Sequence, residues 1–291
     1  MRNYAEENAT VKVKGELLDT NAIYAALLEF SGDRLSEAPS KLVALDLSET
    51  TGLTTISFRM CTSLASIQLP DSVTEIGYEA FHCCRNLKNI TLPNGLTTIG
   101  DNAFYGCTLL ENLTIPASVT RIGRWAFNGC HGLDKVIIPE GVTEIADYAF
   151  STCYGLMIVI LPSTCKKIGD GAFGGTRNLN GISLPEGLTE IGEYAFSNSG
   201  FLVGSIEIPS TVTVIGPKAF YNCVCLVSYN STGPTGIKFK DTARWNHYYD
   251  DAHNSSPCDV SDPKVNAEHL VRIEGSSEIE HTWSRYGLFK R

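Results

Sequence analysis

One stretch of 23 residues, LPNGLTTIGDNAFYGCTLLENLT, recurs along the chain and constrains its fold more than any other feature. Copies begin at Leu69, Leu92, Ile115, Ile138, Leu161, Leu184 and Ile208. A fixed period of about 20 to 50 residues is typical of solenoids, in which each repeat buries its apolar face against its neighbours. The repeat therefore predicts one elongated solenoid, where a length of 291 residues would otherwise suggest two domains.

Three apolar positions recur in each copy and form ladders along the predicted solenoid. They hold Ile76, Ile99, Ile122, Ile145, Ile168, Ile191 and Ile215; Phe81, Phe104, Phe127, Phe150, Phe173, Phe196 and Phe220; and Leu87, Leu110, Leu133, Leu156, Leu179, Leu202 and Leu226. A glycine follows every isoleucine of the first ladder except Ile145, which precedes Ala146. We expect these glycines to occupy turns with positive φ, where other residues would be strained.

Two segments of each copy have the pattern of short strands. The pattern Leu-x-x-Ile-x-Leu-Pro predicts a strand that stops at proline, because proline has no N–H to extend a ladder. The pattern Val-Thr-x-Ile-Gly predicts a second short strand on the opposite wall. Seven clear copies and a degenerate coil near Leu42 together predict a β-rich solenoid of short parallel strands with about eight coils.

The regions outside the repeats set the predicted domain boundaries. Residues 1–40 form a small α/β N-terminal cap, with a helix at residues 21–30, and residues 41–230 form the solenoid. We expect residues 231–253, which include Trp245, Tyr248 and Tyr249, to pack over the last coil as a C-terminal cap. Residues 254–291 are polar and weakly patterned, which predicts a poorly ordered tail.

Most of the ten cysteines fall on a single repeat position. That position holds Cys61, Cys84, Cys107, Cys130, Cys153 and Cys223, and Thr176 and Ser199 in two further copies. A site that accepts Cys, Thr or Ser requires a small, weakly polar, buried side chain. The ladder cysteines are therefore predicted to be structural and unbridged.

The repeat as a whole resembles a known family. Its consensus, Leu/Ile-Pro-x-x-Val/Leu-Thr-x-Ile-Gly-x-x-Ala-Phe-x-x-Cys-x-x-Leu-x-x-Ile, is similar to the BspA-like class of leucine-rich repeat over residues 42–230. The resemblance implies a leucine-rich-repeat solenoid of the kind found in bacterial and protozoan surface proteins that bind host or matrix proteins. It suggests a secreted or cell-surface location. The first residues lack a signal-peptide pattern, so the sequence alone leaves the compartment open.

Composition narrows the classes of partner. The net charge of -9 argues against a protein that follows nucleic-acid phosphates or adsorbs to anionic lipid. The chain contains no apolar run long enough for a transmembrane helix, so membrane insertion is not expected. We expect a protein ligand, no cofactor and a monomeric chain.

The sequence contains no recognisable catalytic constellation, and we expect no enzymatic activity. His82 and His131 occupy variable positions beside the cysteine ladder, and the remaining four histidines follow the repeats. Those four, with Asp250 and Asp251, offer imidazole and carboxylate ligands that suit zinc, but their spacing matches no short metal motif. Metal-dependent activity in the C-terminal region is therefore the least favoured alternative, and no metal site is predicted.

One predicted binding surface lies on the strands. In Leu-x-x-Ile-x-Leu the residues on either side of the isoleucine point outward. Most of them are polar, but Ile137, Ile158 and Ile160 are not, and Lys135 and Met157 adjoin them. An exposed apolar patch indicates a protein-binding site. The alternatives are a shifted register at these strands, or a C-terminal tail that folds over the patch.

A second candidate surface is aromatic. Trp125, Tyr148 and Tyr194 precede the Ala-Phe pair in their copies, and aromatic side chains are frequent interface anchors. The same residues could equally shield the edges of the coils. The favoured function is protein recognition by the strand face, and the main alternative is a surface adhesin or structural spacer whose terminal regions make the contacts.

Overall fold

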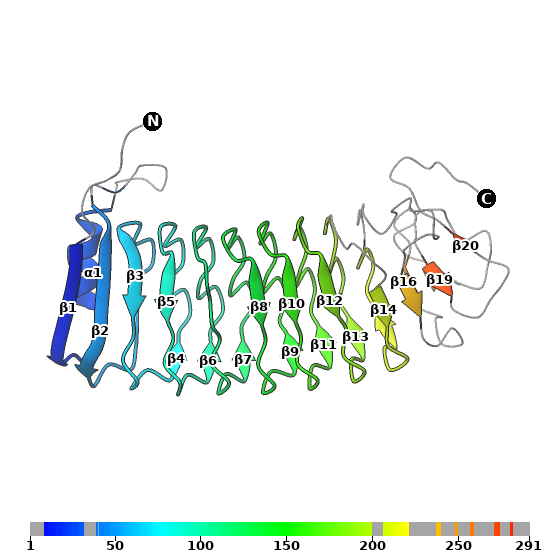
Figure 1. Ribbon diagram of the computed structural model, residues 1–291, viewed down its shortest axis with the longest axis horizontal. Helices are drawn as coiled ribbons and strands as arrows, with labels where there is room; N and C mark the ends of the chain where they lie inside the picture. The colour runs from blue at the N-terminus through cyan, green and yellow to red at the C-terminus, as the bar shows by residue number, and fades with distance from the viewer. Residues whose placement is uncertain are drawn as a thin grey trace.

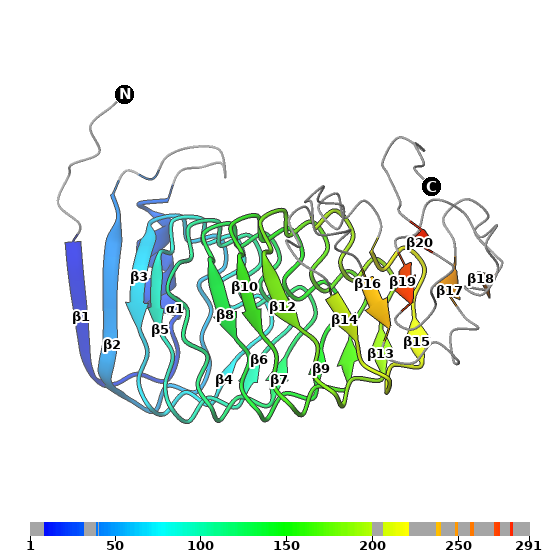
Figure 2. The ribbon, with the colours of Figure 1, turned by 45° about the vertical axis from the view of Figure 1, so that its right-hand side comes forward.

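The computed structural model describes residues 9–31, 39, 41–199 and 206–220, together with five short strands that follow them. The repeats form a parallel β-solenoid (Figures 1 and 2), as the 23-residue period predicted. The five short strands are β16 (Ile237–Phe239), β17 (Tyr248–Tyr249), β18 (Pro257–Cys258), β19 (Val271–Ile273) and β20 (Glu280–His281).

Most coils contribute one strand to each of two walls. The first wall, here called the strand face, contains β1 (Ala9–Glu16), β2 (Val43–Thr51), β3 (Leu64–Gln68), β5 (Asn89–Thr91), β8 (Lys135–Ile137), β10 (Ile158–Ile160), β12 (Gly181–Ser183) and β14 (Ile206–Ile208). The second wall contains β4 (Glu75–Ile76), β6 (Thr98–Ile99), β7 (Arg121–Ile122), β9 (Glu144–Ile145), β11 (Lys167–Ile168), β13 (Glu190–Ile191) and β15 (Val214–Ile215). Turns that carry the Ala-Phe pairs close each coil on a third side.

The N-terminal segment packs against the first coil. Helix α1 (Asn21–Leu28) places Leu27 in the hydrophobic core, and the Ser63 hydroxyl donates a hydrogen bond to the Leu27 carbonyl at 2.8 Å. Strand β1 pairs in parallel with β2, next to α1 (Figure 1). The helix was predicted to reach residue 30 but ends at Leu28, so Phe30 lies beyond it and is exposed. At the other end, β16 pairs with β14 and extends the strand face.

Stacked phenylalanines form the spine of the core. The rings from Phe58 to Phe220 stack in sequence, with centroids 5.2 to 5.8 Å apart. The backbone joins the same turns, because the N–H of each phenylalanine from Phe58 to Phe196 donates to the alanine carbonyl of the next coil, as from Phe81 to Ala103 at 2.8 Å. Burial of a phenylalanine contributes roughly 1.5–3 kcal/mol, and here that burial depends on the adjacent coils.

The cysteine ladder has the structural role that the sequence predicted. Cys84, Cys107 and Cys130 are free and fully buried, and each thiol donates to the carbonyl of a phenylalanine in the preceding coil at 2.8 to 3.1 Å. Ser199 makes the equivalent bond to Phe173 at 2.9 Å, which explains why serine is accepted at this position. Burial raises the pKa of these thiols and keeps them protonated, and it raises the pKa of Cys153 to about 12.

The glycines after the isoleucine ladder have a different role from the one expected. Gly123 and Gly192 do not adopt positive φ. A Cβ at either residue would lie 2.6 Å from backbone atoms of the preceding coil. Glycine is therefore required because two coils approach closely, and the expectation based on positive φ was wrong.

Positive φ occurs instead at the position before each Ala-Phe pair. In that position Glu79, Asn102, Trp125, Tyr148, Tyr194 and Lys218 have φ between 53° and 58°. A left-handed conformation costs roughly 1–2 kcal/mol for residues other than glycine. Hydrogen bonds to the next coil hold it, such as those from the Tyr148 N–H to the Asp170 carbonyl at 2.7 Å and from the Trp125 N–H to the Asp147 carbonyl at 3.0 Å.

Candidate functional site

The predicted apolar patch is exposed on two neighbouring strands. Ile137 on β8 is 51% exposed, and Ile158 and Ile160 on β10 are 44% and 46% exposed. Strands β8 and β10 pair in parallel with Ile160 opposite Ile137 and Ile158 opposite Lys135. Met157, which precedes β10, is 40% exposed. These four apolar residues, Ile137, Met157, Ile158 and Ile160, are called the apolar patch below.

The register of these strands matches the predicted alternation. Val136 and Val159 point inward and are buried, while the residues on either side of them are exposed. A register shift would reverse this pattern, so the structure excludes that alternative explanation of the isoleucines. The C-terminal tail, which the other alternative places over the patch, lies outside the described residues.

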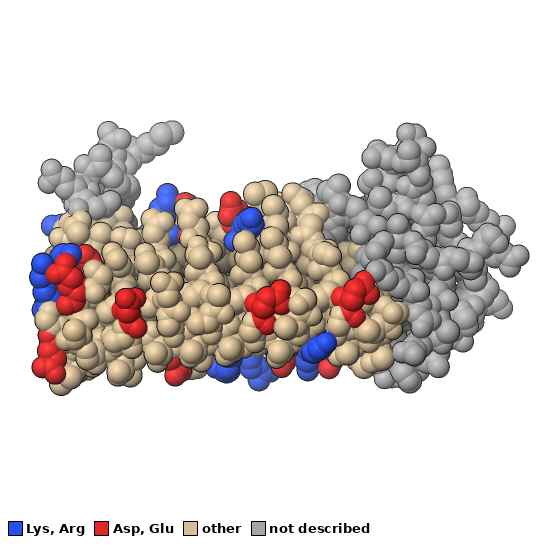
Figure 3. All heavy atoms as spheres, turned by 60° about the horizontal axis from the view of Figure 1, so that its bottom comes forward, with Lys and Arg blue, Asp and Glu red and all other residues tan. Residues whose placement is uncertain are grey.

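Polar residues surround the apolar patch on the strand face. Toward the N-terminus the outward residues include Gln68, Asn89 and Thr91, and toward the C-terminus they are Gly181 and Ser183. On the lower side of the solenoid, which Figure 3 turns forward, charged groups are spread along its length. The apolar patch therefore differs from the rest of the strand face in chemistry but not in backbone register.

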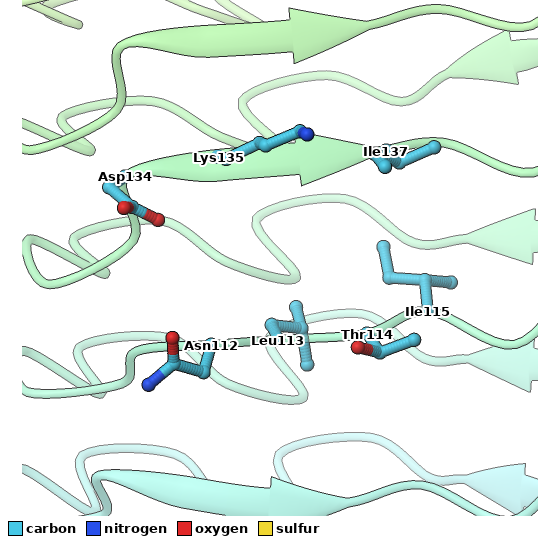
Figure 4. Close-up of a pocket in the computed structure, with 7 residues that line it drawn as sticks. All are labelled: Asn112, Leu113, Thr114, Ile115, Asp134, Lys135 and Ile137. Atoms are coloured by element: carbon cyan, nitrogen blue, oxygen red, sulfur yellow. The ribbon is translucent and has the colours of Figure 1, made fainter.

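The strand face is interrupted next to the apolar patch. Residues 112–114 occupy the place of a strand between β5 and β8, yet among the described residues no ladder bond joins them to either neighbour. A pocket of about 470 Å³ opens at this interruption (Figure 4) and is lined by Asn112, Leu113, Thr114, Ile115, Asp134, Lys135 and Ile137. The repeat pattern predicted a regular strand here, and that prediction was wrong.

Two sequence differences coincide with the interruption. Asn112 has a φ of 48°, which takes the chain out of the extended conformation, and asparagine tolerates this region better than most residues. Leu113 occupies a position that holds Ile or Val in the other clear copies, as at Ile90 and Val136. Because β-branched side chains favour strands, Leu113 weakens the strand preference at this coil.

The second wall is interrupted at the same junction of coils. Strands β7 and β9 are not paired, although β6 pairs with β7 and β9 pairs with β11. Ala146 follows β9 at the position that glycine fills in the other clear copies. At Gly123 and Gly192 a Cβ would lie 2.6 Å from the backbone of the preceding coil, and at Ala146, which has a Cβ, the main-chain bond to the preceding coil is missing.

The aromatic residues of the second candidate surface lie on the turn side of the coils, away from the strand face. Trp125 and Tyr148 are half-buried and stack with centroids 4.2 Å apart. Tyr148 also covers Gly171, where a Cβ would lie 2.3 Å from its ring. Tyr194 instead lies under Lys218, with the amine 5.6 Å from the ring centroid. The structure thus brings together Trp125 and Tyr148, but not Tyr194.

The two repeat histidines are engaged in ring stacking. His82 stacks on Tyr105 with centroids 4.9 Å apart, and His131 stacks on Tyr154 at 4.5 Å. Burial lowers the pKa of both imidazoles, which favours their neutral form. Within the described ranges, no cluster of three or more His, Cys, Asp or Glu could hold a metal ion. The C-terminal histidines belong to residues whose side chains are not described.

These features define a class of protein: a leucine-rich-repeat solenoid with an apolar patch and an adjacent interruption on its strand face. The sequence profile of the BspA type leucine-rich repeat region matches six copies in this chain, over residues 40–156 and 97–227. The chain belongs to this family. None of the helices in the described part of the chain has the length and apolar character needed to cross a membrane.

Solved structures similar to this chain are bacterial leucine-rich-repeat proteins. A leucine-rich repeat protein from Bacteroides ovatus is 31% identical over 65% of this chain and 60% of its own length, with a TM-score of 0.53. This chain thus spans less than two thirds of that protein. The T. pallidum leucine-rich repeat protein is 33% identical over 62% of this chain and 76% of its own length, with a TM-score of 0.48. No curated protein matches significantly.

Proposed function

We propose that this protein is a non-catalytic recognition module that binds a protein partner through the apolar patch on its strand face. The observation that carries the proposal is the exposure of Ile137, Ile158 and Ile160 on paired strands whose alternating residues are buried. A strand needs no isoleucine on its solvent side for folding. Contiguous exposed apolar surface is typical of interaction sites.

The geometry of the strand face supports the same conclusion. Short strands in fixed register hold the side chains of the apolar patch in place before a partner arrives, which lowers the entropy cost of binding. Lys135, opposite Ile158, supplies a charge at the rim of the patch. An apolar centre with a polar rim is the usual arrangement of a protein-binding interface.

A capture experiment with a matched control tests this proposal. The parent chain, the double variant Ile137→Asp/Ile160→Asp and the double variant Gln68→Asp/Thr91→Asp are immobilised and offered the same extract. Gln68 and Thr91 occupy the same outward column of the strand face as the two isoleucines, so both double variants add two charges at equivalent positions.

We expect proteins that the parent captures to be lost with Ile137→Asp/Ile160→Asp and kept with Gln68→Asp/Thr91→Asp, when circular dichroism and melting show both variants to be folded. Retention of every captured protein by Ile137→Asp/Ile160→Asp would disprove recognition by the apolar patch. If capture is then lost on removal of residues 231–291, the adhesin or spacer alternative, with contacts in the terminal regions, is favoured.

A further inference from the structure

Strand β1 forms an edge of the sheet at the N-terminal end of the solenoid. It pairs with β2 on one side, and no strand of the described chain lies on its other side (Figure 1). The Ala9 N–H donates to the Leu42 carbonyl at 3.2 Å, and the Leu17 N–H donates to the Thr51 carbonyl at 2.9 Å. Since main-chain groups alternate sides along a strand, the odd-numbered residues of β1 face β2. The main chain of the even-numbered residues therefore faces the open edge: Thr10, Lys12, Lys14 and Glu16.

The two lysines of this edge are held over β2. The Lys12 amine lies 3.3 Å from the Asp46 carboxylate and 2.6 Å from Glu49, and the Lys14 amine lies 2.8 Å from Glu49. Lysines often protect an edge strand from pairing. Here the carboxylates of β2 draw both amines back over the sheet and balance their charge. Within the described chain, Glu16 is the charged residue of β1 that has no ionic partner.

Apolar surface next to the edge is uncovered. Val11 is 44% exposed, although the residue paired with it on β2, Leu45, is buried. Leu18, which follows β1, is 70% exposed. Gly15 leaves open space beside the strand, because a Cβ there would have no atom within 4 Å. The end of the solenoid thus combines unpaired main chain with exposed apolar side chains, which is the surface that a further strand would cover.

We propose that two copies of this chain associate end to end, through antiparallel pairing of β1 with β1 of the second copy. A twofold axis perpendicular to the sheet relates the two strands, and Lys14 lies on it opposite its own counterpart. This register sets Lys12 opposite Glu16 and Val11 opposite Leu17, twice each by symmetry. Lys12 then supplies the countercharge that Glu16 lacks, and Leu17 covers the exposed Val11.

Neighbouring registers are less complementary. A shift of two residues in one direction sets Lys12 opposite Lys14 twice, and like charges opposite each other destabilise a strand pair. The same shift in the other direction sets Lys12 opposite Leu18. In the proposed register Val13 lies opposite Gly15, whose open space receives the valine side chain. Self-complementarity of β1 in charge and in shape therefore favours a second copy as the occupant of this edge.

Association at β1 leaves the apolar patch uncovered, because β8 and β10 lie several coils away. Since the axis is perpendicular to the sheet, the strand faces of both copies point to the same side. Two apolar patches on one side bind a multivalent partner with greater avidity than a single patch does. This inference goes beyond the proposed function and does not depend on it. It departs from the monomer that the sequence led us to expect, because the open edge is visible only in the structure.

Cysteine crosslinking of the full chain tests the register. The Cα atoms of a hydrogen-bonded antiparallel pair lie about 5.5 Å apart, which suits a disulfide. Mild oxidation of Lys14→Cys should therefore give a disulfide-linked dimer on a non-reducing gel. Lys12→Cys is the matched control, because its two thiols would be about four residues, or roughly 13 Å, apart along the strands. It should give no more dimer than the parent chain, which supplies the background from the native cysteines.

Analytical ultracentrifugation tests the main-chain and charge contributions. Lys14→Ala and Lys14→Pro both remove the ammonium group, but only Lys14→Pro removes the N–H on the open edge, which β2 does not use. We expect the dissociation constant of the dimer to be about tenfold higher in Lys14→Pro than in Lys14→Ala. Glu16→Lys sets two lysines opposite each other and should raise the constant about five- to thirtyfold. Glu75→Lys, the same change at an exposed residue of the second wall, should have no effect.

The inference is overturned if the parent chain stays monomeric up to about 1 mM, if Lys12→Cys crosslinks as readily as Lys14→Cys, or if Lys14→Pro and Lys14→Ala dimerise equally. Circular dichroism shows whether each variant is folded. If Lys14→Pro does not fold, the crosslinking pair and Glu16→Lys decide the question. Partner capture through Ile137 and Ile160 is a separate measurement, so failure of one proposal leaves the other standing.

Discussion

Replacing Ala146 by glycine should join the two parts of the second wall. At the equivalent position of other coils, the glycine N–H donates to the isoleucine of the preceding coil, as from Gly169 to Ile145 at 2.8 Å and from Gly192 to Ile168 at 2.7 Å. At Ala146 the corresponding bond to Ile122 is not formed. The variant Ala146→Gly removes the methyl group and tests whether that group prevents the bond.

The expected gain follows from the bonds that closure restores. If the two coils approach each other, the Ala146→Gly variant forms the bond from the N–H of residue 146 to the Ile122 carbonyl. It also forms the bond from the Thr143 N–H to the Thr120 carbonyl, whose equivalent from Lys166 to Thr143 is 2.7 Å long. Two such bonds contribute about 1–3 kcal/mol. Glycine costs roughly 0.5–1 kcal/mol in backbone entropy. The net expectation is an increase of about 1 kcal/mol in the free energy of unfolding.

The mirror substitution provides the control. Gly192→Ala introduces a methyl group where a Cβ would lie 2.6 Å from the backbone of the preceding coil. It should break the bonds from Gly192 to Ile168 and from Thr189 to Lys166, which are 2.7 and 2.8 Å long. We expect destabilisation of about 1–3 kcal/mol, partly offset by the lower chain entropy of alanine.

Amide exchange is the appropriate assay, because the coils of a solenoid can open locally without unfolding of the whole chain. In Ala146→Gly, exchange at Thr143 and at position 146 should slow, while exchange at Gly192 stays unchanged. In Gly192→Ala, exchange at Thr189 should accelerate. If exchange at Thr143 and position 146 is unaffected in Ala146→Gly, steric separation by the methyl group is not the cause of the interruption.

Three further outcomes follow from the core and its titratable groups. Burial lowers the pKa of His82 and His131, so as the pH falls these imidazoles take up protons in the unfolded chain before they do so in the folded chain. The free energy of unfolding should therefore decrease as the pH drops below about 6.5. The variant His82→Phe/His131→Phe should reduce this pH dependence, as measured by urea titrations at several pH values. Burial keeps the thiols of Cys84, Cys107 and Cys130 protonated, and only a thiolate reacts with iodoacetamide. Mass spectrometry should therefore show no modification of these cysteines at about pH 8 in the folded chain, and modification after unfolding. Phe127→Ala should cost about 3–5 kcal/mol in chemical denaturation, because it leaves a cavity between Phe104 and Phe150, and a much smaller loss would contradict a continuous ring stack.

The sequence was sufficient to predict the core and the outward residues of β8 and β10. A residue that recurs every 23 positions has the same neighbours in each coil, so one pattern fixes the burial of Phe81, Phe127 and Phe196 together. Because side chains alternate between the two faces of a strand, Val136 is predicted to point inward and Ile137 outward without knowledge of any contact. The family relationship depends on these same positions.

The interruption was not predicted because it depends on contacts between coils. Local reasoning assigned positive φ to glycines such as Gly123, whereas the constraint is the backbone of the preceding coil. The two signals were visible: Leu113 is not β-branched, and Ala146 is not glycine. Their significance becomes clear only when the spacing of adjacent coils is known.

The interruption and the apolar patch meet at β8, and this position has a physical consequence. In a regular solenoid each strand satisfies its main chain with two neighbours and offers a partner only side chains. Strand β8 pairs on one side with β10, which carries Ile158 and Ile160, and on the other side presents the unpaired Lys135 and Ile137. The pocket of about 470 Å³ therefore opens directly beside Ile137, at the edge of the apolar patch. The exposed isoleucines and the loss of main-chain pairing thus meet at one junction between coils, which is where we expect departures from the repeat to affect binding most.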